Sequence, residues 1–384
     1  MLMRLSWLTL VAIAVFVLVS CGKNSKFPTS NTMYVATQSS AQVWGYRANF
    51  NNGSLATING SPFTAQAASA ILIDRAQSFA YLATTANGIW RFSFDLNGSL
   101  VPVSGNPVSA GINPVAVAMD SAGKFLFVAN QGTGVAGSNS SSISVFSVGS
   151  GAALTEVQGS PFVVKLPLNS PVANPNPTAV ALVVQPALNL LYVVDENDGY
   201  VLTYPIDPGT GVLPANSTQA TLAGTAPAAI AMNPAGSYLY VANAGSNNIS
   251  GFGIARLGNP LGLAPGTLTA MDKSPFAAEL EPVSAAVDPS GQFLYVVDQA
   301  SNQISGYRIT ATTGDLTPTV GSPYNTGASP IFVAISPINK YLYVSNNSAA
   351  TISGFAIDPN GGNLAAVSSA VTTGTQPTGI AFGK

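Results

Sequence analysis

The chain has 384 residues, of which only 7% are charged, and its 13 Lys and Arg against 15 Asp and Glu give a formal net charge of −2. It contains no His and a single Cys, which excludes His-dependent catalytic triads, His-ligated metals, Cys-rich zinc sites and an internal disulfide. The scarcity of cations also excludes the basic surface that nucleic-acid binding requires. We therefore expect no nucleic-acid partner and no cofactor.

Residues 1–20 have the pattern of a lipoprotein signal peptide. Arg4 precedes an apolar run from Leu5 to Val19, which is shorter than the roughly 20 residues that span a bilayer. The run ends in Leu18-Val19-Ser20-Cys21, which is similar to a bacterial lipobox; the alternative is an uncleaved anchor with a chance Cys. We predict lipidation at Cys21, a lipidated tether over residues 21–32, and a membrane-anchored lipoprotein of the bacterial cell envelope, in the periplasm or at the cell surface.

The rest of the chain repeats one pattern seven times. Each full unit begins with an apolar strand whose first residue is Pro or a small residue. A turn such as NPAGS at 233–237 follows, whose composition is typical of hairpins, and leads into a second strand that contains the motif. A third strand such as ISGF at 249–252 and a weaker fourth one ending in GSPF or a relative follow. The motif itself, an aromatic residue followed by Val or Leu and usually by Asn or Asp two residues later, begins at Tyr34, Tyr81, Phe127, Tyr192, Tyr240, Tyr295 and Tyr343.

The second strands predict how these units assemble. In FLYVV at 293–297 both sets of alternating side chains are apolar, so each sheet must be covered on both faces by neighbouring sheets. We predict an all-β fold, a seven-bladed β-propeller of four-stranded antiparallel blades over residues 33–384. The strand at Tyr34 has no strand before it, and PTGIAFGK at 377–384 has none after it. The C-terminal strand should therefore complete the first blade and close the ring.

The repeat resembles that of the bacterial YVTN-type seven-bladed propellers and, more broadly, of the lactonase family that includes 6-phosphogluconolactonase. The resemblance covers essentially all of residues 33–384. Lactonase-like members tend to carry P-H-x-H in the inner strand of a middle blade. The matching stretch here begins at Pro177 and places Thr178 and Val180 at the two His positions, whereas Asp195 matches a family Asp. The resemblance implies the architecture, and the missing imidazoles argue against lactone hydrolysis.

Ligands of propellers usually bind at the mouth of the central channel, where loops lead into the inner strands and follow the second strands. The charged residues of these loops are the binding candidates, while no catalytic residue and no metal ligand is predicted. They are Asp195, Glu196, Asp198 and Asp298 after second strands, and Lys165, Glu279 and Glu281 before inner strands.

Each acidic group among these candidates has a structural alternative. The run from Asp195 to Gly199 suits calcium, but Asp198-Gly199 is also a preferred hairpin turn, and Asp195 occupies a strand end where other copies have a capping Asn. Glu279 and Glu281 could form an acid–base pair or be solvated loop residues. Asp195, Glu279 and Glu281 are expected to be open to water, and Arg47, Arg91 and Arg308 to be solvated charges on third strands.

The main functional hypothesis is a non-enzymatic binding or interaction module of the cell envelope, whose Ser, Thr, Asn and Gly surface binds a glycan or another envelope protein. The alternative is a lactonase-like hydrolase that uses carboxylates in place of His, and assembly with sister propellers is a third reading. We expect no hydrolysis of sugar lactones such as 6-phosphogluconolactone, because no group titrates near neutral pH and only Lys165 could hold a phosphate. Clustered carboxylates would favour the enzyme.

Overall fold

The computed structural model describes residues 31–86, 88–133, 140–170, 172, 176–367 and 370–383. The predicted signal peptide, Cys21 and the tether up to residue 30 lie outside these residues. Within the described ranges there is no helix with the length and hydropathy needed to cross a membrane. The fold is therefore read from residue 31 onward.

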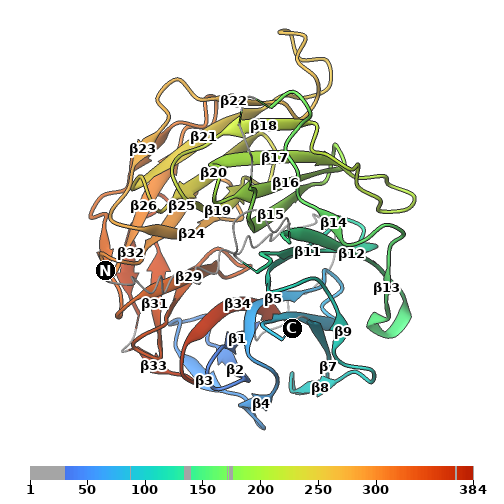
Figure 1. The fold of residues 1–384 in the computed structure, drawn as a ribbon. Helices are drawn as coiled ribbons and strands as arrows, with labels where there is room; N and C mark the ends of the chain where they lie inside the picture. Colours follow the sequence, from blue (N-terminus) through green and yellow to red (C-terminus); the bar gives the residue numbers. More distant parts are fainter. Residues whose placement is uncertain are drawn as a thin grey trace, which may run out of the picture.

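Seven antiparallel sheets stand around a central axis, and each sheet is one blade (Figure 1). The inner strands are β5 (Ala68–Ile73), β10 (Pro114–Met119), β15 (Ala179–Gln185), β19 (Pro227–Met232), β24 (Pro282–Val287), β29 (Pro330–Ile335) and β34 (Pro377–Gly383). The second strands are β1 (Asn31–Thr37), β6 (Phe79–Thr84), β11 (Phe125–Asn130), β16 (Leu190–Asp195), β20 (Tyr238–Asn243), β25 (Phe293–Asp298) and β30 (Tyr341–Asn346).

Two further strands complete the outer part of each blade. The third strands are β2 (Gln42–Ala48), β7 (Gly88–Phe94), β12 (Ser142–Val148), β17 (Tyr200–Pro205), β21 (Asn248–Ile254), β26 (Gln303–Ile309) and β31 (Thr351–Ile357). The fourth strands are β3 (Leu55–Thr57), β8 (Leu100–Pro102), β13 (Leu154–Glu156), β18 (Gln219–Leu222), β22 (Leu268–Ala270), β27 (Leu316–Pro318) and β32 (Leu364–Ala366). A short 3₁₀ turn, η1 (Ser150–Ala152), lies between β12 and β13.

Six blades add a two-residue strand that pairs with the start of the third strand, and the Phe or Tyr of the GSPF-like motif opens four of these strands. They are β4 (Phe63–Thr64), β9 (Val108–Ser109), β14 (Phe162–Val163), β23 (Phe276–Ala277), β28 (Tyr324–Asn325) and β33 (Val371–Thr372). Blade 4, made of β15 to β18, has four strands only. There β18 itself pairs with the start of β17, with Leu222 opposite Tyr200.

The ring closes as the sequence predicts. Blade 1 consists of β34, β1, β2, β3 and β4, so the last strand of the chain pairs with the first one. In Figure 1 the red β34 lies beside the blue β1. The inner strands contact one another in one unbroken cycle, from β34 through β5, β10, β15, β19, β24 and β29 back to β34. The seven-bladed all-β prediction is thus confirmed.

Neighbouring blades are held by apolar packing and by a repeated hydrogen bond. The second strands are buried on both faces; in β25, for example, every residue from Phe293 to Asp298 is buried. Tyr240 of blade 5 donates its hydroxyl to the carbonyl of Gly314 in blade 6 at 2.7 Å. Gly314 has a φ of +78°, and a Cβ there would come within 2.6 Å of the Tyr238 ring. The equivalent bonds are Tyr34–Gly98, Tyr192–Gly266, Tyr295–Gly362 and Tyr343–Gly53.

Arg91 departs from the sequence prediction. It was expected to be a solvated charge, but its side chain is buried in blade 2. Its guanidinium donates to Asn106 Oδ1 and to the carbonyls of Ser104, Gly105 and Ala152. The last of these belongs to blade 3, so Arg91 ties two blades together, and its burial is tolerated because its donors are satisfied. Arg47 and Arg308 are exposed as predicted.

The propeller has two faces that differ in the loops that build them. We call the first face the side where inner strands begin and second strands end, and the second face the opposite side. Every inner strand shifts its register near its first residue, for example between Pro227 and Ala229 in β19. All seven channel-mouth candidates lie on the first face.

Candidate functional site

The last residue of a second strand is the centre of a polar network on the first face. In blade 5 Asn243 is fully buried. Its Oδ1 accepts a hydrogen bond from the backbone N–H of Gly224 at 3.0 Å, and its Nδ2 donates to Asn248 Oδ1 and Ser250 Oγ. Asn346 in blade 7 makes the same set with Gly327, Thr351 and Ser353. The repeated Asn is therefore a structural cap between three segments of one blade.

Blades 4 and 6 place an Asp where blades 3, 5 and 7 place this Asn and where blades 1 and 2 place Thr37 and Thr84. Asp195 and Asp298 are both 0% exposed, so the expectation that Asp195 is open to water is wrong. Burial raises the pKa of Asp195 to about 7 and that of Asp298 to about 7. One oxygen of each carboxyl, Oδ2 of Asp195 and Oδ1 of Asp298, is buried without a hydrogen-bond partner. The first face therefore contains two carboxyl groups with near-neutral pKa values, contrary to the expectation that no group there titrates near neutral pH.

The turn from Asp195 to Gly199 holds two more carboxyls with shifted pKa values. Glu196 accepts a hydrogen bond from Gln131 of blade 3 at 3.4 Å, and Asp198 accepts one from the backbone N–H of Asn176 at 2.9 Å. Burial raises the pKa of both side chains. Asp198 also donates its backbone N–H to Asp195 Oδ1 at 3.3 Å. Three carboxyls with raised pKa values thus belong to one turn, and each accepts a hydrogen bond from a different residue.

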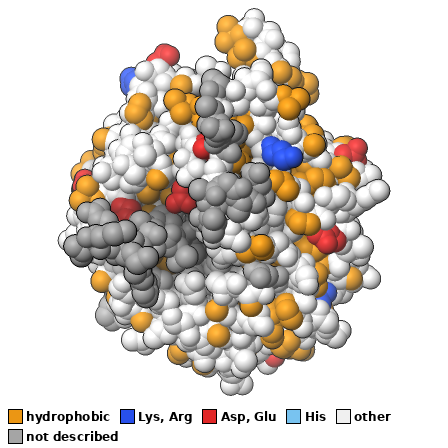
Figure 2. Space-filling model, in the orientation of Figure 1, with side chains coloured by type: hydrophobic (Ala, Val, Ile, Leu, Met, Phe, Trp, Pro, Cys, Tyr) orange, Lys and Arg blue, Asp and Glu red, His pale blue; other side chains and the backbone are white. Residues whose placement is uncertain are grey.

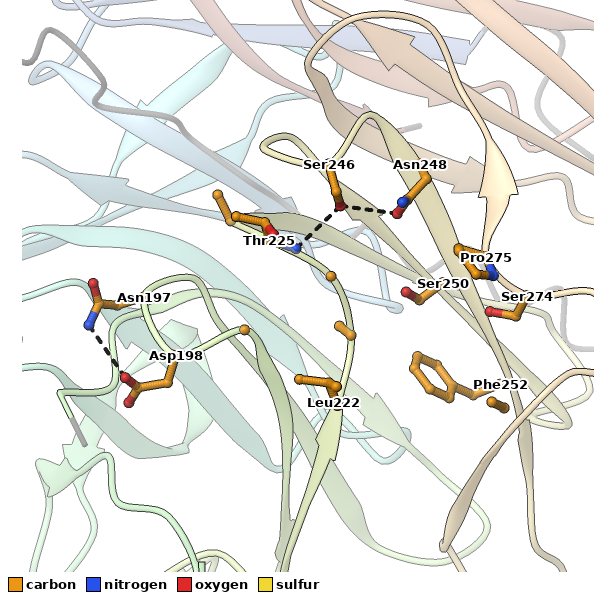
Figure 3. Close-up of a pocket in the computed structure, with 15 residues that line it drawn as sticks. Asn197, Asp198, Leu222, Thr225, Ser246, Asn248, Ser250, Phe252, Ser274 and Pro275 are labelled. Carbon is orange, nitrogen blue, oxygen red and sulfur yellow. Dashed lines mark hydrogen bonds between the residues drawn. The ribbon is translucent and has the colours of Figure 1, made fainter. Parts of the chain in front are cut away.

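A cavity of about 520 Å³ opens beside this turn, between blades 4 and 5. Figure 3 shows Asn197 and Asp198 on one side of it and Ser246, Asn248, Ser250, Ser274 and Pro275 on the other, with Leu222 and Phe252 below. Ser246 Oγ accepts from the backbone N–H of Thr225 and donates to Asn248 Oδ1. Asp198 is the one charged side chain among the described lining residues. The cavity is therefore suited to a neutral ligand rich in hydroxyl groups.

The cavity residues other than Asp198 were not identified from the sequence. Ser246 and Asn248 come from the polar loop after the YLYVAN strand, and Ser250 from the ISGF motif. These motifs recur in other blades with a structural role, so nothing in one copy marks it as part of a cavity. What opens the cavity is the different path of blade 4, in which β18 runs along the start of β17 and Leu222 remains exposed.

The three acidic candidates of blade 6 form a separate group. Glu279 occupies the position of Gly224 in blade 5, and after burial its charge is the largest contribution that raises the pKa of Asp298. Glu281 is half-buried, which raises its pKa, and its backbone N–H donates to Asn247 Oδ1. Both glutamates are thus less open to water than expected. Blade 5 lies between this group and the turn at Asp195, so the structure does not bring the six carboxyls into one cluster.

The remaining candidates have structural roles. The side chain of Lys165 is exposed. Its backbone N–H and carbonyl are both hydrogen-bonded to the hydroxyl of Tyr204. Thr178 donates its backbone N–H to Asp195 Oδ1 at 2.8 Å, and Val180 is buried at the register shift of β15. The two positions that match the family His are therefore filled by a half-buried hydroxyl and an apolar side chain. Among the described residues, no three His, Cys, Asp or Glu side chains form a group able to hold a metal ion.

Comparisons with known proteins agree with this architecture. A putative 6-phosphogluconolactonase from Bacteroides uniformis is 18% identical over 92% of this chain and 99% of its own, with a TM-score of 0.77. A second putative 6-phosphogluconolactonase, from Bacteroides fragilis, is 20% identical over 94% and 100%, with a TM-score of 0.76. The periplasmic gluconolactonase of Pseudomonas aeruginosa is 20% identical over 92% and 99%, also with a TM-score of 0.76.

At these identities the solved structures establish the fold alone, and no curated protein matches the chain. The family comparison goes further, because it matches most of the sequence. The model described as "Lactonase, 7-bladed beta-propeller" aligns with residues 25–169, 181–333 and 323–384. Together with the closed ring of seven blades, this match shows that the chain belongs to the family of seven-bladed β-propeller lactonases.

Proposed function

We propose that this protein is a lactonase-type hydrolase that acts on a neutral lactone, with Asp198 as the general base. One observation carries the proposal: Asp198 is a half-buried carboxyl with a raised pKa at the edge of a cavity that has no other charged side chain among its described lining residues. A carboxylate is a better base when its pKa is closer to the working pH. Family membership supports hydrolysis over the non-enzymatic binding that we favoured from the sequence.

The reaction requires little of the protein beyond a base and hydrogen-bond donors. Asp198 would take a proton from a water molecule as the water oxygen bonds to the lactone carbonyl carbon. The bond between that carbon and the ring oxygen then breaks, and the ring oxygen receives the proton, so that one lactone and one water give one hydroxy acid. Hydroxyl and amide donors such as Ser246 and Asn248 line the cavity and would stabilise the negative charge on the carbonyl oxygen.

The charge of the cavity selects the substrate class. A phosphorylated lactone carries about two negative charges and needs several cations to hold it, but Asp198 is the charged residue here and it is acidic. The comparison protein named as a periplasmic gluconolactonase bears a name without a phosphate. An exported, membrane-anchored protein, as the first 21 residues predict, would also meet neutral sugars and their lactones outside the cytoplasm.

A second function, binding of a neutral glycan without turnover, is favoured by one specific observation. Val180 and Thr178 stand where lactonase-like members tend to have His, and Val180 is 1% exposed. If hydrolysis depends on imidazole, the cavity would retain a sugar and leave it unchanged. The same cavity residues would bind the ligand in both cases.

The test is a hydrolysis assay of the full chain on gluconolactone and on 6-phosphogluconolactone, against a blank without protein. We expect turnover of the neutral lactone above the blank, rising with pH as Asp198 loses its proton. Asp198→Asn should lower kcat by about 10²- to 10⁴-fold. Glu196→Gln is the matched control, because Glu196 belongs to the same turn but accepts its hydrogen bond from Gln131 in blade 3. Equal activity of Asp198→Asn and wild type would refute the assignment.

A further inference from the structure

The hairpin between the third and fourth strands of blade 5 is enlarged. It comprises residues 255–267, which is 13 residues, whereas the equivalent turns of blades 1, 2, 3, 6 and 7 have five or six. Figure 1 shows it projecting beyond the ring, above β22 at the top of the view. The other turns already connect the same two strands, so the additional residues are not needed to form the blade.

Two leucines at the tip of this hairpin face solvent. Leu257 is 76% exposed and Leu261 is 77% exposed, and Figure 2 shows hydrophobic side chains gathered on the projection. Arg256 beside them is exposed, with its guanidinium bonded to the hydroxyl of Ser237. A cavity of about 1120 Å³ separates the hairpin from the turns of blades 5 and 6. The leucines are therefore not packed against the body of the propeller.

The tip has a fixed shape despite its exposure. The side chain of Asn259 accepts hydrogen bonds from the backbone N–H groups of Leu261 and Leu263 and donates to the carbonyl of Leu263 at 2.6 Å. Leu257 and Leu261 are thus presented on a closed loop, which lowers the entropy that contact with a partner would cost. An apolar group on a projecting loop next to a cation is the composition expected of a membrane-contacting element.

The chain enters the propeller from the same side. Asn31, the first described residue, pairs with Ala48 at the second-face end of blade 1, and β1 runs from there to Thr37 on the first face. The described part of the chain therefore begins at the second face. The hairpin also leaves from the second-face end of β21, because Asn248 lies at the first face and Ile254 at the opposite end.

The two faces also differ in charge, and the second face is the less acidic of the two. The first face carries six acids and Lys165 as its one described cation, so its ionised form would be repelled by anionic lipid. The second face is nearly balanced, with seven acids against six of the nine described cations. These cations are Arg47, Arg75, Lys124, Arg256, Arg308 and Lys340.

We propose that the hairpin 255–267 docks on a lipid bilayer with anionic head groups, with Leu257 and Leu261 in the acyl interface and Arg256 among the head groups. The hairpin and the N-terminal segment then hold the second face toward the membrane. The first face, with the cavity beside Asp198, is turned toward the aqueous side, where a soluble sugar reaches it. This inference does not depend on whether the cavity binds or hydrolyses its ligand.

The test places a tryptophan at the tip of the full chain in vesicles of phosphatidylcholine and phosphatidylglycerol with brominated acyl chains. Leu261→Trp should show at least twofold stronger bromine quenching than the wild type, whose native tryptophans provide the background. Leu280→Trp is the matched control, since Leu280 is a 56% exposed leucine on the first face, and it should show no additional quenching. Equal quenching at the two positions, or quenching at Leu280 alone, would overturn the proposal.

A second variant distinguishes membrane docking from misfolding of the protein and from contact of the hairpin with a second copy of the chain. Residues 255–267 are replaced by the six-residue turn of blade 6, residues 310–315 (TATTGD), which retains the glycine at the Gly266 position. The replacement variant should melt as a folded propeller and, because it lacks residue 257, show no vesicle-dependent shielding of its tryptophans from acrylamide. Leu257→Trp in the otherwise unchanged chain should become shielded from acrylamide when vesicles are added. Shielding of that tryptophan without vesicles, increasing with protein concentration, would assign the hairpin to a second copy and refute membrane docking.

Discussion

Blades 4 and 5 share the order of their inner, second and third strands but end their second strands in different residues. In blade 5 Asn243 has a partner for each of its polar atoms, among them Ser250 and the N–H of Gly224. In blade 4 the corresponding positions hold Asp195, Leu202 and Asn176, so one carboxyl oxygen has no partner. The two blades thus differ in the charge of the residue at this strand end, in its hydrogen-bond partners and in the path of the outer strand beside the cavity.

Every blade depends on a closed ring for its neighbours. Opening the ring should therefore have the largest effect on stability. Deleting residues 377–384 removes β34, including the hydrogen bond from Thr378 Oγ1 to the carbonyl of Ala68. The edge of β1 becomes unpaired, which favours aggregation. We expect a loss of at least 10 °C in Tm or an insoluble protein, measured by calorimetry and gel filtration. A truncated protein that melts like the full chain would contradict the closure.

Converting the acidic blades to the Asn of their neighbours should change stability in a pH-dependent way. The folded pKa of Asp195 and of Asp298 is raised from 3.8 to about 7, so the folded state binds more protons than the unfolded state between these values. Stability is therefore lost as pH rises from about 4 to 7, by about 4 kcal/mol per carboxyl, and is constant above. Asp298→Asn should be stabilising at pH 8 and flatten the pH profile of urea unfolding.

Asp298→Asn also has a structural reason to be tolerated, because Ser305 lies where Ser250 accepts the amide in blade 5. Asp207→Asn is the control for charge removal, since the pKa of that exposed carboxyl is lowered, chiefly by hydrogen bonds from Thr210. An unchanged pH slope in Asp298→Asn would show that the carboxyl is not strained by burial.

Removing the cap of blade 5 should have the next largest effect. Asn243→Ala leaves the backbone N–H of Gly224 and the Asn248 and Ser250 side chains without their shared, fully buried partner. The cost of unsatisfied buried groups predicts a loss of about 2–4 kcal/mol in the free energy of unfolding. Asp195→Ala should lower the free energy of unfolding by less at pH 8, because it also removes a buried charge. Equal losses at the two positions would contradict the difference between blades 4 and 5.

The smallest effect concerns the seams between blades. Tyr240→Phe removes the bond to the buried carbonyl of Gly314 and should cost about 1 kcal/mol. Tyr81 occupies the equivalent strand position in blade 2, but its buried hydroxyl has no partner. Tyr81→Phe should therefore be neutral or slightly stabilising. Chemical denaturation of the two variants side by side measures the difference, and a larger loss for Tyr81→Phe would contradict it.

Part of the site could be predicted from the sequence, and the limit is physical. Asp195 and Asp298 were identified because the repeat register places them at second-strand ends, and this required only counting. Their burial could not be predicted, because it depends on how the loops before the next inner strands cover them, as the N–H of Thr178 does for Asp195. The same holds for Arg91, whose burial depends on carbonyl acceptors that include one from blade 3.

The sequence by itself determined the architecture. A motif with two apolar faces, repeated seven times and split between the two ends of the chain, is compatible with a closed ring of stacked sheets because only stacking buries both faces and only closure pairs both ends. The tertiary structure decided the chemistry. Whether Asp198 faces a cavity, and whether Leu257 and Leu261 face solvent, depends on the paths of β18 and of one hairpin. Such paths arise from contacts between residues far apart in the chain, which no local pattern contains.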